Sequence, residues 1–166
     1  MTDDAKQQVM LAHAAETMAA ARNRLYAAKF QREGRPRLAR TFTALALAEE
    51  FHAQRMLMHL RGRMQDGDAY LEALRAGKQK DAAAGFGRIA AALAATGEHT
   101  MAEAFEQFAQ VAGNHLGLID GAAAEAAADP SNLYVCKVCG FIAADQPPDK
   151  CPVCGAVAKK FVAAQD

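Results

Sequence analysis

YVCKVCGFIAADQPPDKCPVCG (residues 134–155) holds all four cysteines of the chain in two Cys-x-x-Cys motifs, each followed directly by glycine. Paired motifs of this kind form two knuckles that place four sulfurs at the corners of a tetrahedron. Gly140 and Gly155 suit left-handed backbone conformations, which allow peptide N–H groups to point at the sulfurs. The stretch therefore predicts a small metal domain with four ligands: Cys136, Cys139, Cys151 and Cys154.

Four sulfur ligands alone do not distinguish Zn(II) from a single iron ion, because the two metals have similar sizes and ligand preferences. Three aromatic residues around the cysteines, Tyr134, Phe141 and Phe161, give the site a small apolar core. A site shielded in this way can pass one electron at a time, which favours iron. Zinc in a structural ribbon is the alternative. Cysteines confined to one end of the chain also indicate thiolate ligation instead of disulfides, which fits a reducing compartment.

The overall composition restricts the class of function. The chain has 166 residues, enough for one well-buried core and a small appendage. Basic and acidic residues number 19 each, so we expect no basic surface for nucleic acid. The start, MTDDAKQQVM, lacks the features of a signal peptide, and no stretch approaches the roughly 20 apolar residues of a membrane span. We expect a cytoplasmic protein that binds neither nucleic acid nor membranes.

Residues 4–128 have the periodicity of four long amphipathic helices. Gly34 ends the first helix, and Pro36 suits the first turn of the second. The third helix follows a break at residues 65–68, although three glycines within it cost about 1 kcal/mol each relative to alanine. The fourth helix ends before Asp129, which precedes a proline. Long helices with short turns predict a mainly α chain, with a four-helix bundle over 1–128, a linker over 129–133 and the metal domain over 134–166.

The two halves of the helical region also match each other at one constant spacing. Ala-rich sequences produce chance matches readily, so the glycine, phenylalanine and histidine pairs carry more weight than the alanine pair. We infer a duplicated helical hairpin. The matched pairs are Gly34 with Gly97, Phe42 with Phe105, Ala46 with Ala109, and His52 with His115.

The motif Tyr-x-Cys-x-x-Cys-Gly-Phe, the motif Cys-Pro-x-Cys-Gly and Phe161, placed behind four helices, resemble the rubrerythrin family. The resemblance covers nearly the whole chain and implies a ferritin-like four-helix bundle followed by a rubredoxin-like iron domain. It implies a peroxidase-type oxidoreductase of oxidative stress defence. In that family an NAD(P)H-linked reductase passes electrons to iron at the cysteines, and the bundle passes them to hydrogen peroxide. The resemblance also implies a homodimer.

The resemblance extends to metal ligands in the helices. Ferritin-like di-iron bundles use a Glu from each of two helices and a Glu-x-x-His pair from each of the other two. The second helix contains such a pair in Glu49 and His52, and Glu16 lies in the first helix at the same distance from Gly34 as His52. The resemblance therefore implies Glu16, Glu49 and His52 as ligands of one metal, and it places His115 at the second imidazole position.

The second half of the helical region departs from the family pattern. Ala112 stands at the place of the second bridging glutamate, and the Glu-x-x-Glu of the third helix falls on Lys78 and Asp81. Asn23 replaces a tyrosine of the family. An iron pair draws on about four carboxylates, whereas the Lys78 ammonium can itself balance buried carboxylates. We therefore predict helices without metal, or with a single metal on Glu16, Glu49, His52 and Asp81, in preference to a di-iron centre.

Two other functions stay open beside the peroxidase. One is a one-electron carrier or redox sensor, which keeps iron at the four cysteines and uses the helices for dimerisation or docking. The other is a structural protein that holds zinc in its tail. Colour separates these alternatives, because oxidised iron bound to four thiolates is red and zinc is colourless.

Overall fold

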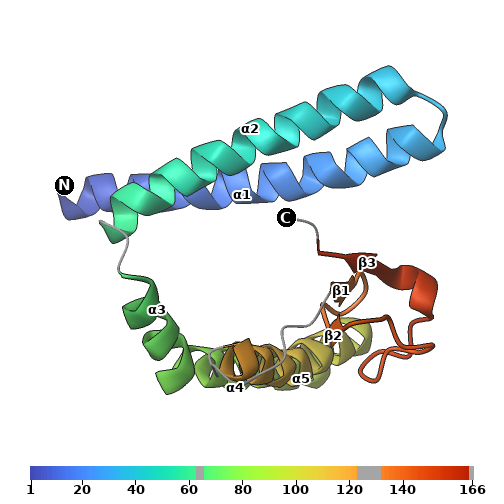
Figure 1. Cartoon of the computed structure of the whole chain (residues 1–166). Helices are drawn as coiled ribbons and strands as arrows, with labels where there is room; N and C mark the ends of the chain where they lie inside the picture. The colour runs from blue at the N-terminus through green and yellow to red at the C-terminus, as the bar shows by residue number, and fades with distance from the viewer. Residues whose placement is uncertain (63–65, 123–131, 165–166) are drawn as a thin grey trace. The chain divides into compact units, whose positions relative to one another are not determined.

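The computed structural model describes residues 1–62, 66–122 and 132–164, apart from the side chains of residues 78–80. The chain is mainly α-helical and ends in a small sheet domain that contains the four cysteines (Figure 1), which confirms the predicted fold class. It divides into two compact units, Met1–Gln65 and Asp66–Asp166. Of the predicted linker at 129–133, residues 129–131 lie outside the described residues.

The first unit is a hairpin of two long helices, α1 (Asp3–Arg32) and α2 (Pro36–Arg61). Thr2 caps α1 by accepting a hydrogen bond from the Ala5 N–H at 3.3 Å. Gly34 adopts φ 68° in the turn, a left-handed conformation that glycine tolerates without strain. The helices approach closely because small side chains lie buried between them: Ala20, Ala27, Ala39, Ala46 and Ala53.

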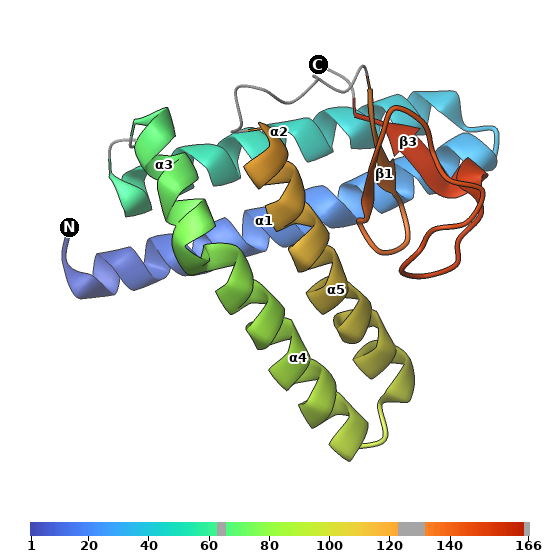
Figure 2. The same cartoon turned by 60° about the horizontal axis from the view of Figure 1, so that its bottom comes forward.

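The second unit begins with a helix that is interrupted where the sequence predicts a single one. It consists of α3 (Gly67–Ala73), the π-helical turn η1 (Leu74–Lys78) and α4 (Gln79–Ala95). Gly77 leaves the helical conformation at φ 164° and ψ −21°. Glycine is a weak helix former, so the interruption falls at a position that stabilises the helix little. Helix α5 (His99–Ala122) then runs antiparallel to α4 (Figure 2).

The two hairpins share local features that the internal repeat predicts. Gly97 takes φ 85° in the turn between α4 and α5, as Gly34 does between α1 and α2. The matched phenylalanines both join aromatic clusters. Phe42 packs on Phe30 with ring centroids 5.0 Å apart, and Phe105 packs on Phe108 with centroids 5.5 Å apart. The repeat is therefore visible in the turns and in the packing of the structure.

The C-terminal domain is built on a three-stranded antiparallel sheet with the order β2-β1-β3. Its strands are β1 (Leu133–Cys136), β2 (Ile142–Ala144) and β3 (Phe161–Ala163), and the 3-10 turn η2 (Ala158–Lys160) precedes β3. The central strand pairs Cys136 with Phe161, which brings an aromatic ring next to the first cysteine. Within the described residues, no helix has both the length and the apolar character needed to span a membrane.

Candidate metal centre

The four cysteines converge on one point of the C-terminal domain. Their sulfurs all lie within 4.8 Å of one another, with Cys136 and Cys154 separated by 3.7 Å and Cys139 and Cys151 by 3.5 Å. A tetrahedral ion with metal–sulfur bonds of about 2.3 Å requires sulfurs about 3.8 Å apart. The spacing of the thiols therefore fits an ion of the size of iron or zinc.

The two knuckles repeat one local geometry. Gly140 and Gly155 adopt φ 82° and 69°, and their N–H groups donate to the carbonyl oxygens of Cys136 and Cys151, each at 2.9 Å. The glycines therefore close the turns, and their own N–H groups do not serve the sulfurs. The residues that follow them do: the N–H of Phe141 donates to the Cys139 sulfur and the N–H of Ala156 to the Cys154 sulfur.

The thiols differ in acidity because burial and hydrogen bonding oppose each other. Burial raises the pKa of Cys139 and of Cys154 above the ordinary value, despite the N–H groups that point at them. Burial also acts on the pKa of Cys136, but hydrogen bonds from the backbone of Cys139 and Val138 outweigh it and leave that pKa lowered. A bound cation requires thiolates, so metal binding displaces the remaining protons.

An apolar cluster covers the sulfurs. Phe161 is buried with three of the cysteines, and Tyr134 and Phe141 pack against the cluster, as the sequence predicts. The cluster also contains Val111, which comes from helix α5. The sequence offers no signal for that contact, because a valine in an amphipathic helix has no distinguishing neighbour.

Helix α5 holds the C-terminal domain through polar contacts as well. The Asn114 side chain donates to the Ile142 carbonyl at 3.2 Å and accepts from the Ile142 N–H at 3.0 Å, so the two residues form a reciprocal pair. The His115 Nε2 lies 3.0 Å from the Gly140 carbonyl oxygen. The domain that carries the cysteines is thus attached to α5 of the same chain.

The predicted ligands of the first hairpin come together as separate pairs. Glu16 and His52 are 3.1 Å apart, from carboxylate oxygen to Nδ1. Glu49 pairs instead with Asn23, whose amide nitrogen donates to both carboxylate oxygens at 2.9 and 2.8 Å. Among the described residues, the four cysteines are the single group of three or more His, Cys, Asp or Glu whose donor atoms converge.

The predicted site residues of the second half do not converge among the described residues. Ala112 is buried on α5, and Asp81 is exposed near the start of α4. His115 reaches the C-terminal domain, and Lys78 is a residue whose side chain lies outside the description. Ligation by Glu16, Glu49, His52, Asp81 or His115 stays a prediction.

Comparison with known proteins agrees with this architecture. Residues 8–118 match the family model described as rubrerythrin, and residues 134–162 match the model described as rubrerythrin, rubredoxin-like domain. Among solved structures, the partially reduced state of nigerythrin is 21% identical to this chain, with a TM-score of 0.53. The match covers 96% of this chain and 86% of the nigerythrin chain. Its fully reduced, all-ferrous state has the same identity, coverage and TM-score. A comparison with curated proteins gave no match. The first family model covers more than half of the chain and the second covers the four-cysteine site, so the chain belongs to the rubrerythrin family.

Proposed function

We propose that this protein is a one-electron carrier that holds iron at its four cysteines and no iron pair in its helices. The observation that carries the proposal is a set of four sulfurs at the spacing of a metal tetrahedron, inside an apolar cluster. Iron bound there supplies a one-electron couple between its ferric and ferrous states. The N–H groups of Phe141 and Ala156 stabilise thiolate charge, and the buried Phe161 keeps water from the site.

The donor set of the helices supports the second half of the proposal. Both Glu49 carboxylate oxygens already accept hydrogen bonds from the Asn23 amide, and Ala112 offers no carboxylate at all. Glu16, Glu49 and Asp81 provide three carboxylates, one fewer than an iron pair typically draws on. We therefore propose no metal in the helices, or a single metal on these carboxylates with His52. Peroxide reduction takes two electrons, and helices without an iron pair hold no two ferrous ions to supply them together.

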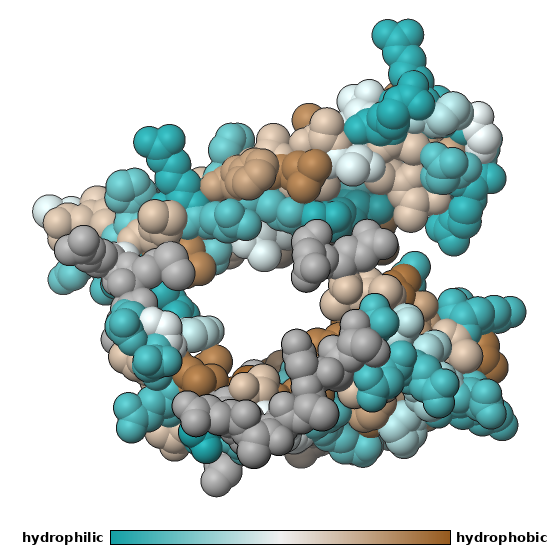
Figure 3. Space-filling model, viewed as in Figure 1, coloured by the Kyte–Doolittle hydropathy of each residue, from teal (hydrophilic) through white to brown (hydrophobic). Residues whose placement is uncertain are grey.

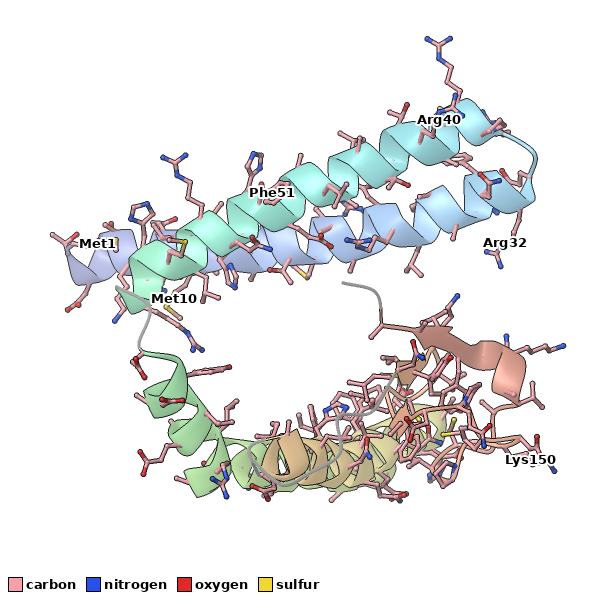
Figure 4. All side chains as sticks on the ribbon, viewed as in Figure 1. Met1, Met10, Arg32, Arg40, Phe51 and Lys150 are labelled. Carbon is pink, nitrogen blue, oxygen red and sulfur yellow. The ribbon has the colours of Figure 1, made fainter. Side chains whose placement is uncertain are left out.

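The charge of the C-terminal domain indicates the kind of electron donor. Between residues 132 and 164 there are four lysines and two aspartates, and the charge of −1 on Fe(III) bound by four thiolates leaves a net charge of about +1. All four lysines are exposed, and none has an ion-pair partner among the described residues. They are Lys137, Lys150, which Figure 4 labels, Lys159 and Lys160. We propose a donor with an acidic docking face, such as an NAD(P)H-linked reductase, because opposite charges speed association.

The first hairpin supports the proposed homodimer. Apolar residues lie at the surface of α2 (Figure 3), and Phe51 among them is 66% exposed. Contiguous exposed apolar patches mark surfaces that bind other proteins. We propose that pairing of two chains covers this surface.

Metal analysis of protein purified from its native source tests the proposal. We expect a red protein, because ferric thiolate complexes absorb visible light, with one iron per chain, or two where the helices hold a single iron. About three irons per chain would favour a peroxidase with a di-iron centre in the helices. Zinc alone on the thiolates of the native protein would refute the proposal.

A further inference from the structure

One peptide group connects helix α5 to a sulfur of the metal centre. The Gly140–Phe141 peptide accepts a hydrogen bond at its carbonyl oxygen from the His115 Nε2, 3.0 Å away. The N–H of the same peptide donates to the Cys139 sulfur. A carbonyl oxygen can only accept, so the Nε2 of His115 must carry a proton in this contact. The chain of bonds therefore runs from imidazole through peptide to sulfur.

The contact is held in place from the same face of α5. Val111, Asn114 and His115 are spaced by three and four residues, so all three project toward the C-terminal domain. Val111 packs in the apolar cluster of the cysteines, and Asn114 forms the reciprocal pair with Ile142. The imidazole thus meets Gly140 through a docking surface that does not depend on His115 alone.

The side chains around the contact are mostly apolar. His115 and Cys139 line one cavity of about 320 Å³, whose other lining residues are all apolar: Ala82, Phe86, Phe108, Val111 and Ala112. With few competing side-chain dipoles, hydrogen bonds in series polarise one another, by about 10 to 30% per bond. A donor on the Gly140 carbonyl therefore strengthens the Phe141 N–H as a donor to the Cys139 sulfur.

We propose that His115 is a positioning residue that raises the reduction potential of the four-cysteine centre through the Gly140–Phe141 peptide. Reduction adds one electron from the donor protein to the centre, without breaking a bond or moving a proton. The reduced centre carries one more negative charge, so a stronger N–H bond to sulfur stabilises it more than the oxidised centre. The inference rests on the proposed function, in which iron occupies the site. It uses the Nε2 of His115 and leaves its Nδ1 available.

Three variants of the full chain test this role. His115→Leu removes the donor, His115→Gln keeps an N–H at a similar reach, and Asn114→Ala loosens the docking without removing the imidazole. In the iron-loaded protein we expect the largest fall in midpoint potential for His115→Leu, a smaller fall for Asn114→Ala and a potential near that of the wild type for His115→Gln. Equal potentials in all four proteins would overturn the proposal. So would an Asn114→Ala shift as large as that of His115→Leu, because loosened docking would then explain both.

A second measurement does not depend on iron. In the zinc-loaded protein, the Phe141 amide proton resonance reports the strength of its hydrogen bond to sulfur. We expect this resonance to move upfield in His115→Leu and to return in His115→Gln. An unchanged resonance in His115→Leu would refute the connection through the peptide. If zinc-loaded variants respond as expected and no reversible iron couple exists in the native protein, the proposed function fails and the connection stands.

Discussion

Replacement of Asn23 by aspartate tests how the first hairpin accommodates its carboxylates. Asn23 is only 8% exposed, and its amide donates to both Glu49 oxygens at 2.9 and 2.8 Å. Asn23→Asp keeps the shape of the side chain and replaces the donor with a second carboxylate. Two ionised carboxylates about 4 Å apart repel each other by about 4 kcal/mol at an effective dielectric constant of about 20.

Proton uptake limits this cost. Either carboxyl can bind a proton instead, at about 1.4 kcal/mol for each pH unit above an ordinary pKa of about 4. The destabilisation caused by the second carboxylate at pH 7 therefore cannot exceed about 4 kcal/mol. The like-charged neighbour raises the folded-state pKa above the unfolded one, so the variant is least destabilised below about pH 4.5 and loses stability as pH rises. Asn23→Ala is the matched control, because it removes the donor without adding charge and costs about 1.5 to 3 kcal/mol.

Urea unfolding followed by circular dichroism measures both variants, with the cysteine site already loaded with metal. We expect Asn23→Asp to be the less stable variant at pH 7 and to gain stability toward pH 5. The free energy of unfolding of Asn23→Ala should change little between pH 7 and pH 5. Added zinc should stabilise Asn23→Asp selectively, since a cation between two carboxylates replaces the lost amide. If Asn23→Asp is as stable as the wild type at pH 7, Asn23 and Glu49 are not paired in the folded protein.

Four other outcomes follow from the structure. Cys139→Ser should abolish the red colour while circular dichroism shows the helices intact, and global unfolding would contradict independent packing of the helices. Lys78→Glu combined with Ala112→Glu should increase the iron bound per chain by metal analysis, and unchanged iron would mean that these positions are wrongly matched to the family. Lys137→Glu with Lys160→Glu should slow electron uptake from an acidic donor at low salt, with the difference vanishing at high salt where charges are screened. In the metal-free protein, burial raises the pKa of the Cys139 thiol. The free energy of unfolding should therefore be constant below the unfolded-state pKa of about 8.5 and fall as the pH rises above that value. Urea unfolding at pH 7 and at pH 9.5 measures the difference.

The parts of the fold that the sequence predicts are those with local causes. Gly34 and Gly97 end helices because their backbone angles favour glycine, and Pro36 begins one because it lacks an N–H to lose. The spacing of the cysteines within each knuckle is likewise set by a single turn. These features depend on residues a few positions apart, so they can be recognised without a tertiary structure.

The remaining features depend on contacts between distant residues. Helix propensity assigns the same cost to each of three glycines in the predicted third helix. The helix nevertheless breaks at Gly77 and continues through Gly85 and Gly87. The pairing of Asn23 with Glu49 joins two helices, and neither residue predicts the other. The contact of His115 with Gly140 joins a helix to a knuckle 25 residues later. In each case the deciding energy is a tertiary contact, which periodicity and spacing do not encode.

His115 shows how one residue can satisfy two interpretations. The internal repeat matches it to His52, whose Nδ1 meets Glu16 at 3.1 Å within its own hairpin. The residue three positions before His115 is the buried Ala112, so no carboxylate on that turn of α5 competes for its imidazole. The Nε2 is directed instead at the peptide that serves the Cys139 sulfur. The absence of a carboxylate at residue 112 is compatible with the hydrogen bond to the metal domain, because no acidic side chain on that turn of α5 draws the imidazole away from the Gly140 carbonyl. On this reasoning, Ala112→Glu should weaken the contact between His115 and Gly140 and lower the reduction potential, even where no metal enters the helices.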